Sequence, residues 1–375
     1  MSNWQLPEGI DELTGEQAFV FESVRRCLLD LYQSWGYELV VPPMVEYIES
    51  LILTSNSVDQ KTFKFLDSNS GRMLGVHSDI TPQIARIDSK RSKPNKTDRY
   101  CYINAILKTQ ADDFYATRSP IQAGAELYGY KGIEADIEVI ELMVASLSIL
   151  NIQGLTLSLG NTAIFNALCE ATELDKQDIA TLRDIFKRKS IPDLDTFLAG
   201  HAIKEADKFS ALISLDGDDQ VLGRALKAFA GFPSVVEAIN DLIKLNKVFN
   251  GNGIKLMFDL GEVKAYEYHN GIVFAAYHPN YSKALAQGGR YNGLSQSFGV
   301  SRDATGFSFD LKFLIQQQIS NPIKSKILNV PTSDDPELKA FINDLRLQGF
   351  IVRQDFTSSN NLDIKKVDGK WALKD

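Results

Sequence analysis

The stretch Arg99–Gly129, RYCYINAILKTQADDFYATRSPIQAGAELYG, decides the fold of this chain. Residues 99–110 are apolar and rich in aromatic and β-branched types. The same character returns at residue 121, after the polar segment ADDFYATRSP. Two β-rich runs on either side of a polar segment predict a β-hairpin. Because the chain around it does not alternate strand and helix, we expect an α+β fold on an antiparallel sheet flanked by helices.

Helical periodicity occurs on both sides of this hairpin. Residues 14–36 and 133–150 carry apolar side chains at helical spacing, and a further helix is expected to open near Thr81 and Pro82. The intervening YELVVPPMVEY predicts a strand that is broken by its two prolines, because a central strand seldom holds proline.

The second half of the chain predicts an insertion and a tail. From about 162 to 250 the charge rises and helical periodicity dominates, which indicates an inserted helical subdomain. Strands are expected again from residue 254, and ATGFSFDLKFLIQQQI (304–319) is expected to be a helix. We therefore predict one domain over 1–322 with this insertion, and a small α/β segment over 323–375.

Composition excludes several classes of protein. The 375 residues carry a formal net charge of −8, which argues against a protein that mainly grips a phosphate backbone. The three cysteines form no CxxC pair, and neither a GxxxxGK[ST] nor a GxGxxG motif occurs. The N-terminus has no signal-peptide pattern, and no apolar run is long enough to span a membrane. We expect a cytoplasmic protein without a metal or other cofactor.

Several stretches, in this order, resemble the signatures of class II aminoacyl-tRNA synthetases of the histidyl type. The resemblance covers roughly residues 8–320, and it implies a dimer interface at the first stretch, an ATP-binding hairpin at the second and a histidine pocket at the next two. These stretches are GYELVVPPMVEY, the hairpin 99–129, YEYHNGIVFAAY, QGGRYNGL and ATGFSFDLKFL.

The positions that the family uses for adenylation are altered. Where the first strand of the hairpin should end in Phe-Arg-x-Glu, this chain has Lys108 and Gln110, and a lysine ammonium cannot replace the planar fork of arginine. Asp310 and Phe313 occupy the motif 3 positions, and Lys264 occupies the position of a catalytic arginine. Phosphoryl chemistry depends on positioned positive charge, so the resemblance implies that adenylation has been lost.

The positions that bind the amino acid are kept. By resemblance, the ligand ammonium would be bound by Asp79, Thr81 and Gln122, and Glu126 would bind the imidazole. The remaining candidates are the second imidazole partner, which is Tyr268 or His269; Tyr291, which would close the pocket; and Lys264, which would offer a charge to the carboxylate.

Each of these residues also has an ordinary explanation. Glu126 could lie on a solvated strand face, the tyrosines could be core residues, and QGGRYNGL alone is typical of a turn. Arg290, within QGGRYNGL, is expected to form an interior ion pair. The order of the stretches favours the pocket.

The chain resembles the regulatory subunit family of ATP phosphoribosyltransferase in three respects. Its adenylation positions are altered, its histidine pocket is kept, and its tail is too short for an anticodon-binding domain. The resemblance implies a non-catalytic subunit with a homodimer core. It would activate the short catalytic subunit in a hetero-oligomer and convey feedback inhibition by free L-histidine, without binding tRNA. The alternative is a truncated histidyl-tRNA synthetase-like enzyme that still activates histidine with ATP, or a paralogue that activates an amino acid for another acceptor.

Overall fold

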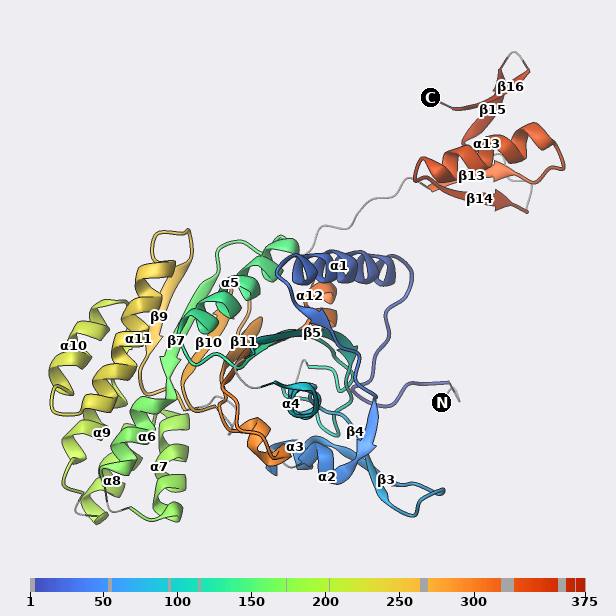
Figure 1. Cartoon of the computed structure of the whole chain (residues 1–375). Helices are drawn as coiled ribbons and strands as arrows, with labels where there is room; N and C mark the ends of the chain where they lie inside the picture. Colours follow the sequence, from blue (N-terminus) through green and yellow to red (C-terminus); the bar gives the residue numbers. More distant parts are fainter. Residues whose placement is uncertain are drawn as a thin grey trace. The chain divides into compact units, whose positions relative to one another are not determined.

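The computed structural model divides the chain into two compact units, Met1–Ser320 and Asn321–Asp375 (Figure 1). Each is described by itself. The residues that the structure describes are 4–52, 56–93, 96–113, 116–172, 174–201, 203–263, 269–317, 327–356, 362–367 and 369–374.

A nine-stranded sheet forms the platform of the first unit. Its central strands pair antiparallel, as predicted, but the pairs β1–β5 and β7–β9 are parallel, so the sheet is mixed. In spatial order the strands are β1 (Glu38–Leu39), β5 (Asp98–Ala105), β6 (Ile121–Tyr128), β12 (Ala304–Asp310), β11 (Ala286–Arg290), β10 (Ile272–Tyr277), β7 (Thr156–Asn161), β9 (Lys255–Asp259) and β8 (Asp216–Gly217).

The predicted hairpin is confirmed as β5 and β6, which pair from Asp98 opposite Tyr128 to Ala105 opposite Ile121. Side chains alternate between the two faces of a strand. Ala123, Ala125 and Leu127 therefore enter the core on one face, while Gln122, Glu126 and Tyr128 lie on the other.

Different helices cover the two faces of the sheet (Figure 1). On the face of Ala123 pack α1 (Gly15–Ser34), α5 (Glu134–Ile149) and α12 (Leu311–Gln316). On the opposite face lies α4 (Thr81–Arg91), which packs against the 3-10 helix η1 (Leu294–Phe298). Near α4 lie α2 (Ile48–Ile52), α3 (Asn56–Lys61) and a small sheet of β2 (Val45–Tyr47), β4 (Met73–Val76) and β3 (Phe63–Leu66). Among the described helices, none is both long and apolar enough to cross a membrane.

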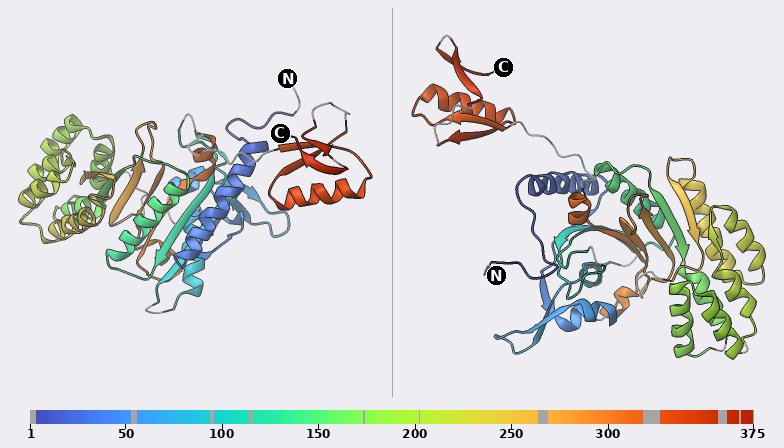
Figure 2. Two further views of the ribbon diagram at one scale, coloured as in Figure 1. Left: turned by 90° about the horizontal axis from the view of Figure 1, so that it is seen from above. Right: turned by 180° about the vertical axis from the view of Figure 1, so that it is seen from behind.

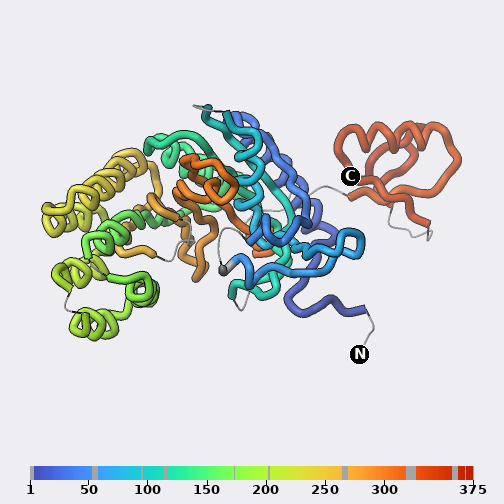
Figure 3. Tube along the Cα trace, turned by 60° about the horizontal axis from the view of Figure 1, so that its bottom comes forward, coloured from blue at the N-terminus to red at the C-terminus, as the bar shows by residue number. Residues whose placement is uncertain are grey.

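The predicted helical insertion forms a cluster at the β7–β9 end of the sheet, away from α1 (Figures 2 and 3). The two-residue strand β8 interrupts it and joins the sheet edge at β9. The helices are α6 (Thr162–Glu170), α7 (Lys176–Arg188), α8 (Ile191–His201), α9 (Ala206–Leu212), α10 (Gln220–Ala228) and α11 (Pro233–Phe249).

The prediction of a helix over 304–319 is wrong for its first half. ATGFSFD forms β12, in which Phe307 and Phe309 are buried on the core face and Gly306 and Ser308 lie on the other. This period-2 pattern stabilises a strand. The helix α12 begins only after Asp310, whose side chain accepts a hydrogen bond from the Phe313 backbone N–H at 3.1 Å.

The second unit has its own small core around Leu328, Val330 and Ile342. As predicted for the tail, a strand, a helix and a strand are followed by short strands. These elements are β13 (Ile327–Pro331), α13 (Pro336–Leu347), β14 (Ile351–Asp355), β15 (Ile364–Val367) and β16 (Lys370–Leu373). β13 and β14 pair in parallel, and β15 and β16 form a separate hairpin.

A buried ion pair fastens α5 to the core face of the sheet. Arg290 of β11 and Asp136 of α5 lie 2.6 Å apart with side chains 8% and 1% exposed, as expected of an interior ion pair. Arg290 also donates to the backbone carbonyls of Tyr130 and Gly132. Burial raises the pKa of Asp136, and the charge of Arg290 offsets only part of this shift. The ionised form of Asp136 therefore depends on Arg290 for its stability.

We expect Arg290→Met to destabilise the protein by about 3–5 kcal/mol, because it leaves the Asp136 carboxyl buried without its cation. Urea denaturation followed by far-ultraviolet circular dichroism measures this change in the free energy of unfolding. Arg26→Met is the matched control, because Arg26 pairs with Glu22 on an exposed face of α1 and its loss should change little. Equal effects of the two substitutions would contradict the role given to Arg290.

Candidate functional site

The candidate site lies on the sheet face that α4 covers in part. Cross-strand register places Glu126, Gly306, Gly289, Val273 and Gly160 in one row across five strands on this face. Side chains of directly paired residues in antiparallel strands share a face. Three of the five positions are glycines, so they place no side chain on this face beside the Glu126 carboxyl.

Glu126 is the centre of the polar network. It is 1% exposed and accepts hydrogen bonds from the hydroxyls of Thr81 at 2.9 Å, Tyr102 at 3.1 Å and Tyr291. Burial raises the pKa of the Glu126 carboxyl to about 8, although the hydrogen bonds from Tyr291 and Thr81 oppose this shift. The network therefore holds a carboxyl that titrates near physiological pH.

The position of Glu126 depends on two glycines. A Cβ atom on Gly306 would lie 1.6 Å from Glu126 Oε2, and a Cβ on Gly124 would lie 2.6 Å from the Tyr102 hydroxyl. Any larger residue at Gly306 would expel the carboxyl from its place over the neighbouring strand.

Asp79 and Gln122 meet at the start of α4. Gln122 Nε2 donates to Asp79 Oδ1 at 2.9 Å, and its Oε1 accepts from the backbone N–H of Ile80 at 3.0 Å. The Thr81 backbone N–H lies 3.3 Å from the same Asp79 oxygen. The structure thus brings Asp79, Thr81, Gln122 and Glu126 together, and their role toward a ligand stays a prediction.

Tyr291 and His269 form one wall of the site. Tyr291 is 2% exposed, and its ring centroid lies 6.2 Å from that of His269. Burial lowers the pKa of the His269 imidazole to about 3, so this ring is neutral at physiological pH. Lys264 and Tyr268 lie outside the described residues, so the choice between Tyr268 and His269 stays open.

The glycine pair of QGGRYNGL is required by neighbouring protein atoms. A Cβ on Gly288 would lie 2.1 Å from the Gly306 carbonyl oxygen and 2.7 Å from the Phe274 ring, and one on Gly289 would lie 2.7 Å from the Ile272 carbonyl oxygen. Close strand and ring packing explains both glycines.

Positive charge in the hairpin is neutralised within the chain. Lys108 Nζ lies 2.5 Å and Lys61 Nζ 2.7 Å from the Asp112 carboxylate. Burial opposes the ionisation of Asp112, but the two lysines outweigh it and lower its pKa. Gln110 is exposed on the loop.

The motif 3 positions have structural roles. Asp310 caps α12, and burial raises its pKa. The Lys283 ammonium lies 3.8 Å from the centroid of the Phe313 ring and 3.2 Å from Asp113. Lys108, Asp310, Phe313 and Lys283 line a common cavity of about 260 Å³.

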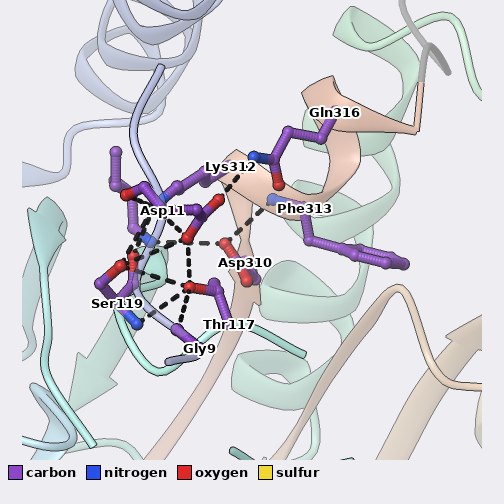
Figure 4. Close-up of polar contacts among 9 residues, drawn as sticks. Gly9, Asp11, Thr117, Ser119, Asp310, Lys312, Phe313 and Gln316 are labelled. Atoms are coloured by element: carbon purple, nitrogen blue, oxygen red, sulfur yellow. Dashed lines mark hydrogen bonds and ion pairs between the residues drawn. The ribbon is translucent and has the colours of Figure 1, made fainter. Parts of the chain in front are cut away.

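The neighbouring Lys312 extends toward Asp11, whereas the Phe313 ring extends in the other direction (Figure 4). It is 4% exposed, and its ammonium lies 2.8 Å from the Asp11 carboxylate and 2.9 Å from the Ser119 carbonyl oxygen. Gln316 donates to the other Asp11 oxygen at 2.6 Å. The contact fastens the N-terminal segment to α12 and to the loop residue Ser119 just before β6.

No role in the site was predicted for Tyr102, Gly306, Gln287 or Ser308, which the structure places at it. Tyr102 could have been found from the predicted hairpin. It lies opposite Gly124, between the pairs of Asn104 with Gln122 and of Tyr100 with Glu126, and so shares a face with both site residues. The positions of Gly306, Gln287 and Ser308 on the site face follow from the pairing of β11 with β12. This pairing was not expected, because a helix was predicted over 304–319. Across the residues that the structure describes, no group of three or more His, Cys, Asp or Glu side chains could hold a metal ion.

Comparison with known proteins identifies relatives over nearly the full chain. Residues 9–314 match the family model of histidyl-tRNA synthetase. ATP phosphoribosyltransferase regulatory subunits are 38% identical in Nitrosococcus oceani, with 99% of this chain and 95% of the relative covered, and 41% identical in Thiobacillus denitrificans, with 84% and 98% covered.

Solved structures share the fold. An ATP phosphoribosyltransferase regulatory subunit/histidyl-tRNA synthetase from Bacillus halodurans has a TM-score of 0.83 at 24% identity, with 96% of each chain covered. A chain of the ATP phosphoribosyl transferase (HisG:HisZ) complex from Thermotoga maritima has a TM-score of 0.60 at 18% identity, with 78% of this chain and 98% of that chain covered.

We expect Glu126→Gln to change how stability depends on pH. A carboxyl whose pKa is raised from 4.5 to about 8 keeps its proton in the folded state after the unfolded state has lost it. In wild type, its contribution to the free energy of unfolding therefore falls as pH rises through this window, by up to about 1.4 kcal/mol per pH unit. The free energy of unfolding of the variant should lack this fall. The stability of the variant relative to wild type should therefore increase as pH rises through the same window.

Urea denaturation at a series of pH values measures the difference. Glu141→Gln, on an exposed position of α5, is the control and should follow wild type throughout. Parallel curves for Glu126→Gln and wild type would show that the Glu126 carboxyl does not titrate differently on folding.

Proposed function

The chain belongs to the ATP phosphoribosyltransferase regulatory subunit family, and from this premise we propose that it is a non-catalytic subunit that activates a short catalytic subunit and conveys inhibition by histidine. One observation carries the proposal. The adenylation half of the synthetase-like site is neutralised by its own side chains, whereas the amino-acid half keeps a connected polar network around Glu126.

The charge of the former nucleotide cavity supports the loss of catalysis. Asp112, Asp113 and Asp310 border it, and Lys108 and Lys283 lie within salt-bridge distance of the first two. A triphosphate would have to displace these carboxylates from the lysines, and it would also meet the carboxyl of Asp310. Transfer of a phosphoryl or adenylyl group needs positive charge that is already in position.

The amino-acid half suits free L-histidine. A carboxylate at Asp79 and the hydroxyl of Thr81 are acceptors for an ammonium group, and Glu126 can accept from an imidazole N–H. Both carboxyls are buried, so a ligand that leaves them unpaired would be strongly rejected. We include Gln122, His269, Tyr291, Lys264 and Tyr268 in this pocket.

Regulation would follow from differential binding. The subunit stabilises an active arrangement of its partner, and histidine binds better to a less active arrangement. Coupling of this kind is typically on the order of 1–3 kcal/mol and acts in both directions. Histidine must therefore also change the affinity between the two subunits.

We propose a homodimer core within the hetero-oligomer, built around residues 36–47. β1 is the edge strand of the sheet, and Leu39, Val41 and Met44 beside it are 44%, 70% and 52% exposed. An unpaired strand edge with exposed apolar side chains favours association with another chain. The acidic net charge argues against tRNA binding, and the free cysteines fit a cytoplasmic protein.

Reconstitution with the short catalytic subunit tests the proposal. We expect the purified chain to raise the ATP phosphoribosyltransferase activity of that subunit, and L-histidine to reverse the increase. Calorimetry with histidine should detect binding to the chain alone or to the complex. The proposal fails if the chain does not change the activity, or if histidine binds to neither.

The alternative is an enzyme that activates histidine with ATP, which the match to the histidyl-tRNA synthetase family favours. We expect histidine-dependent exchange of pyrophosphate into ATP to stay at background, because Lys108 and Lys283 are held by carboxylates of the chain. An authentic histidyl-tRNA synthetase is the positive control. Exchange above background by the folded chain would support the alternative.

A further inference from the structure

The site is narrow beside the Glu126 carboxyl. The cavity that this carboxyl lines with Thr81, His269 and Tyr291 has a volume of about 10 Å³, which is room for about one water molecule. The Glu126 oxygens already accept hydrogen bonds from Thr81, Tyr102 and Tyr291. A ligand ring that bonds to Glu126 must therefore displace some of these donors and widen the cavity.

The elements that can give way are α4 and η1. Tyr102 lies on β5, which is held by hydrogen bonds to β1 on one side and to β6 on the other. Thr81 instead opens α4, and Tyr291 directly follows β11. α4 and η1 pack together in a small core that includes Tyr291 and Leu294. Widening the cavity therefore displaces α4 and η1 rather than the sheet.

The side of α4 that faces away from Thr81 carries Gln83. Two residues along a helix turn a side chain by about 200°, and Gln83 is fully buried. Its Nε2 donates to the Pro43 carbonyl oxygen at 2.8 Å and to Glu46 Oε1 at 2.7 Å, while its Oε1 lies 2.6 Å from His77 Nδ1. Leaving a buried amide without its partners is costly. A displaced α4 therefore takes these partners with it.

Two of the groups bonded to this amide belong to the proposed dimer segment. Pro43 and Glu46 lie within residues 36–47, next to Met44, whose side chain is 52% exposed. Arg86, one turn further along α4, donates to the same Glu46 oxygen at 2.5 Å. A movement of α4 thus reaches the surface that we assign to contact with a second copy of the chain.

We propose that Gln83 is a positioning residue that couples the histidine pocket to the dimer segment 36–47. The inference rests on the proposed function and names the route by which an occupied pocket alters the contact between two copies of the chain. α4 has two arrangements, one bonded to Glu126 and one displaced by the ligand, and histidine shifts their populations. The Gln83 amide moves Pro43 and Glu46 between the same two arrangements.

Gln83→Met tests this coupling, because it removes the amide and keeps a long side chain on the helix. Dimers of the full chain that carry different fluorophores exchange subunits, and energy transfer measures the rate with and without saturating L-histidine in the presence of the catalytic subunit. We expect histidine to change the wild-type rate about fivefold or more, and the variant rate by less than about twofold. Calorimetry should still detect histidine binding to the variant.

Three further variants complete the experiment. Gln33→Met makes the same substitution on an exposed position of α1 and should behave as wild type. Glu46→Leu removes the acceptor on the dimer segment and should also weaken the histidine effect, so the inference can be tested even if Gln83→Met fails to fold. Glu46→Gln keeps an oxygen that can accept from Gln83 and Arg86, and it should retain the effect.

Outcomes separate this inference from the proposed regulatory function. If wild type binds histidine without a change in the exchange rate, or if Gln83→Met and Glu46→Leu keep the full change, the coupling is overturned and regulation by histidine still stands. Variants that are merely less stable would keep the full change. If wild type binds no histidine with its catalytic partner present, the proposed function fails and the coupling fails with it.

Discussion

The burial of one carboxyl group constrains the whole site. Glu126 is almost completely enclosed, so it needs donors, and they come from α4 through Thr81, from β5 through Tyr102 and from the residue after β11 through Tyr291. Gly306 must lack a side chain for the carboxyl to fit. A single buried acceptor thus fixes the relative positions of a helix and four strands, because an unpaired buried carboxyl would be costly.

Electrostatics distinguishes the two halves of the synthetase-like site. Lys108 and Lys283 line the cavity beside the hairpin loop, Lys312 lies in α12 next to Phe313, and each of the three is paired with an aspartate of the chain. Their charge stabilises the hairpin loop, the Phe313 ring and the N-terminal segment. The network of Asp79, Thr81, Gln122 and Glu126 instead concentrates buried hydrogen-bond acceptors on the sheet face beside α4.

Much of the fold could be predicted from the sequence, and the error at residues 304–319 is informative. The hairpin, the helical insertion and the elements of the tail have clear local patterns. In ATGFSFDLKFL, a strand of period 2 runs directly into a helix, and the apolar residues fit both periods. Only pairing with β6 and β11 makes the first half a strand, so Gly306 and Ser308 could not be assigned to the site.

The sequence by itself determined the order of the motifs, the absence of arginine at positions 108, 264 and 313 and the set Asp79, Thr81, Gln122 and Glu126, because these depend on residue type and spacing. The tertiary structure decided which of these groups are buried, which are paired and which face a cavity. It turned Lys312 toward Asp11 and placed Gln287 opposite Ser308. Charge pairing and cross-strand register join residues that are far apart in the chain. Local sequence patterns therefore cannot specify which residues pair.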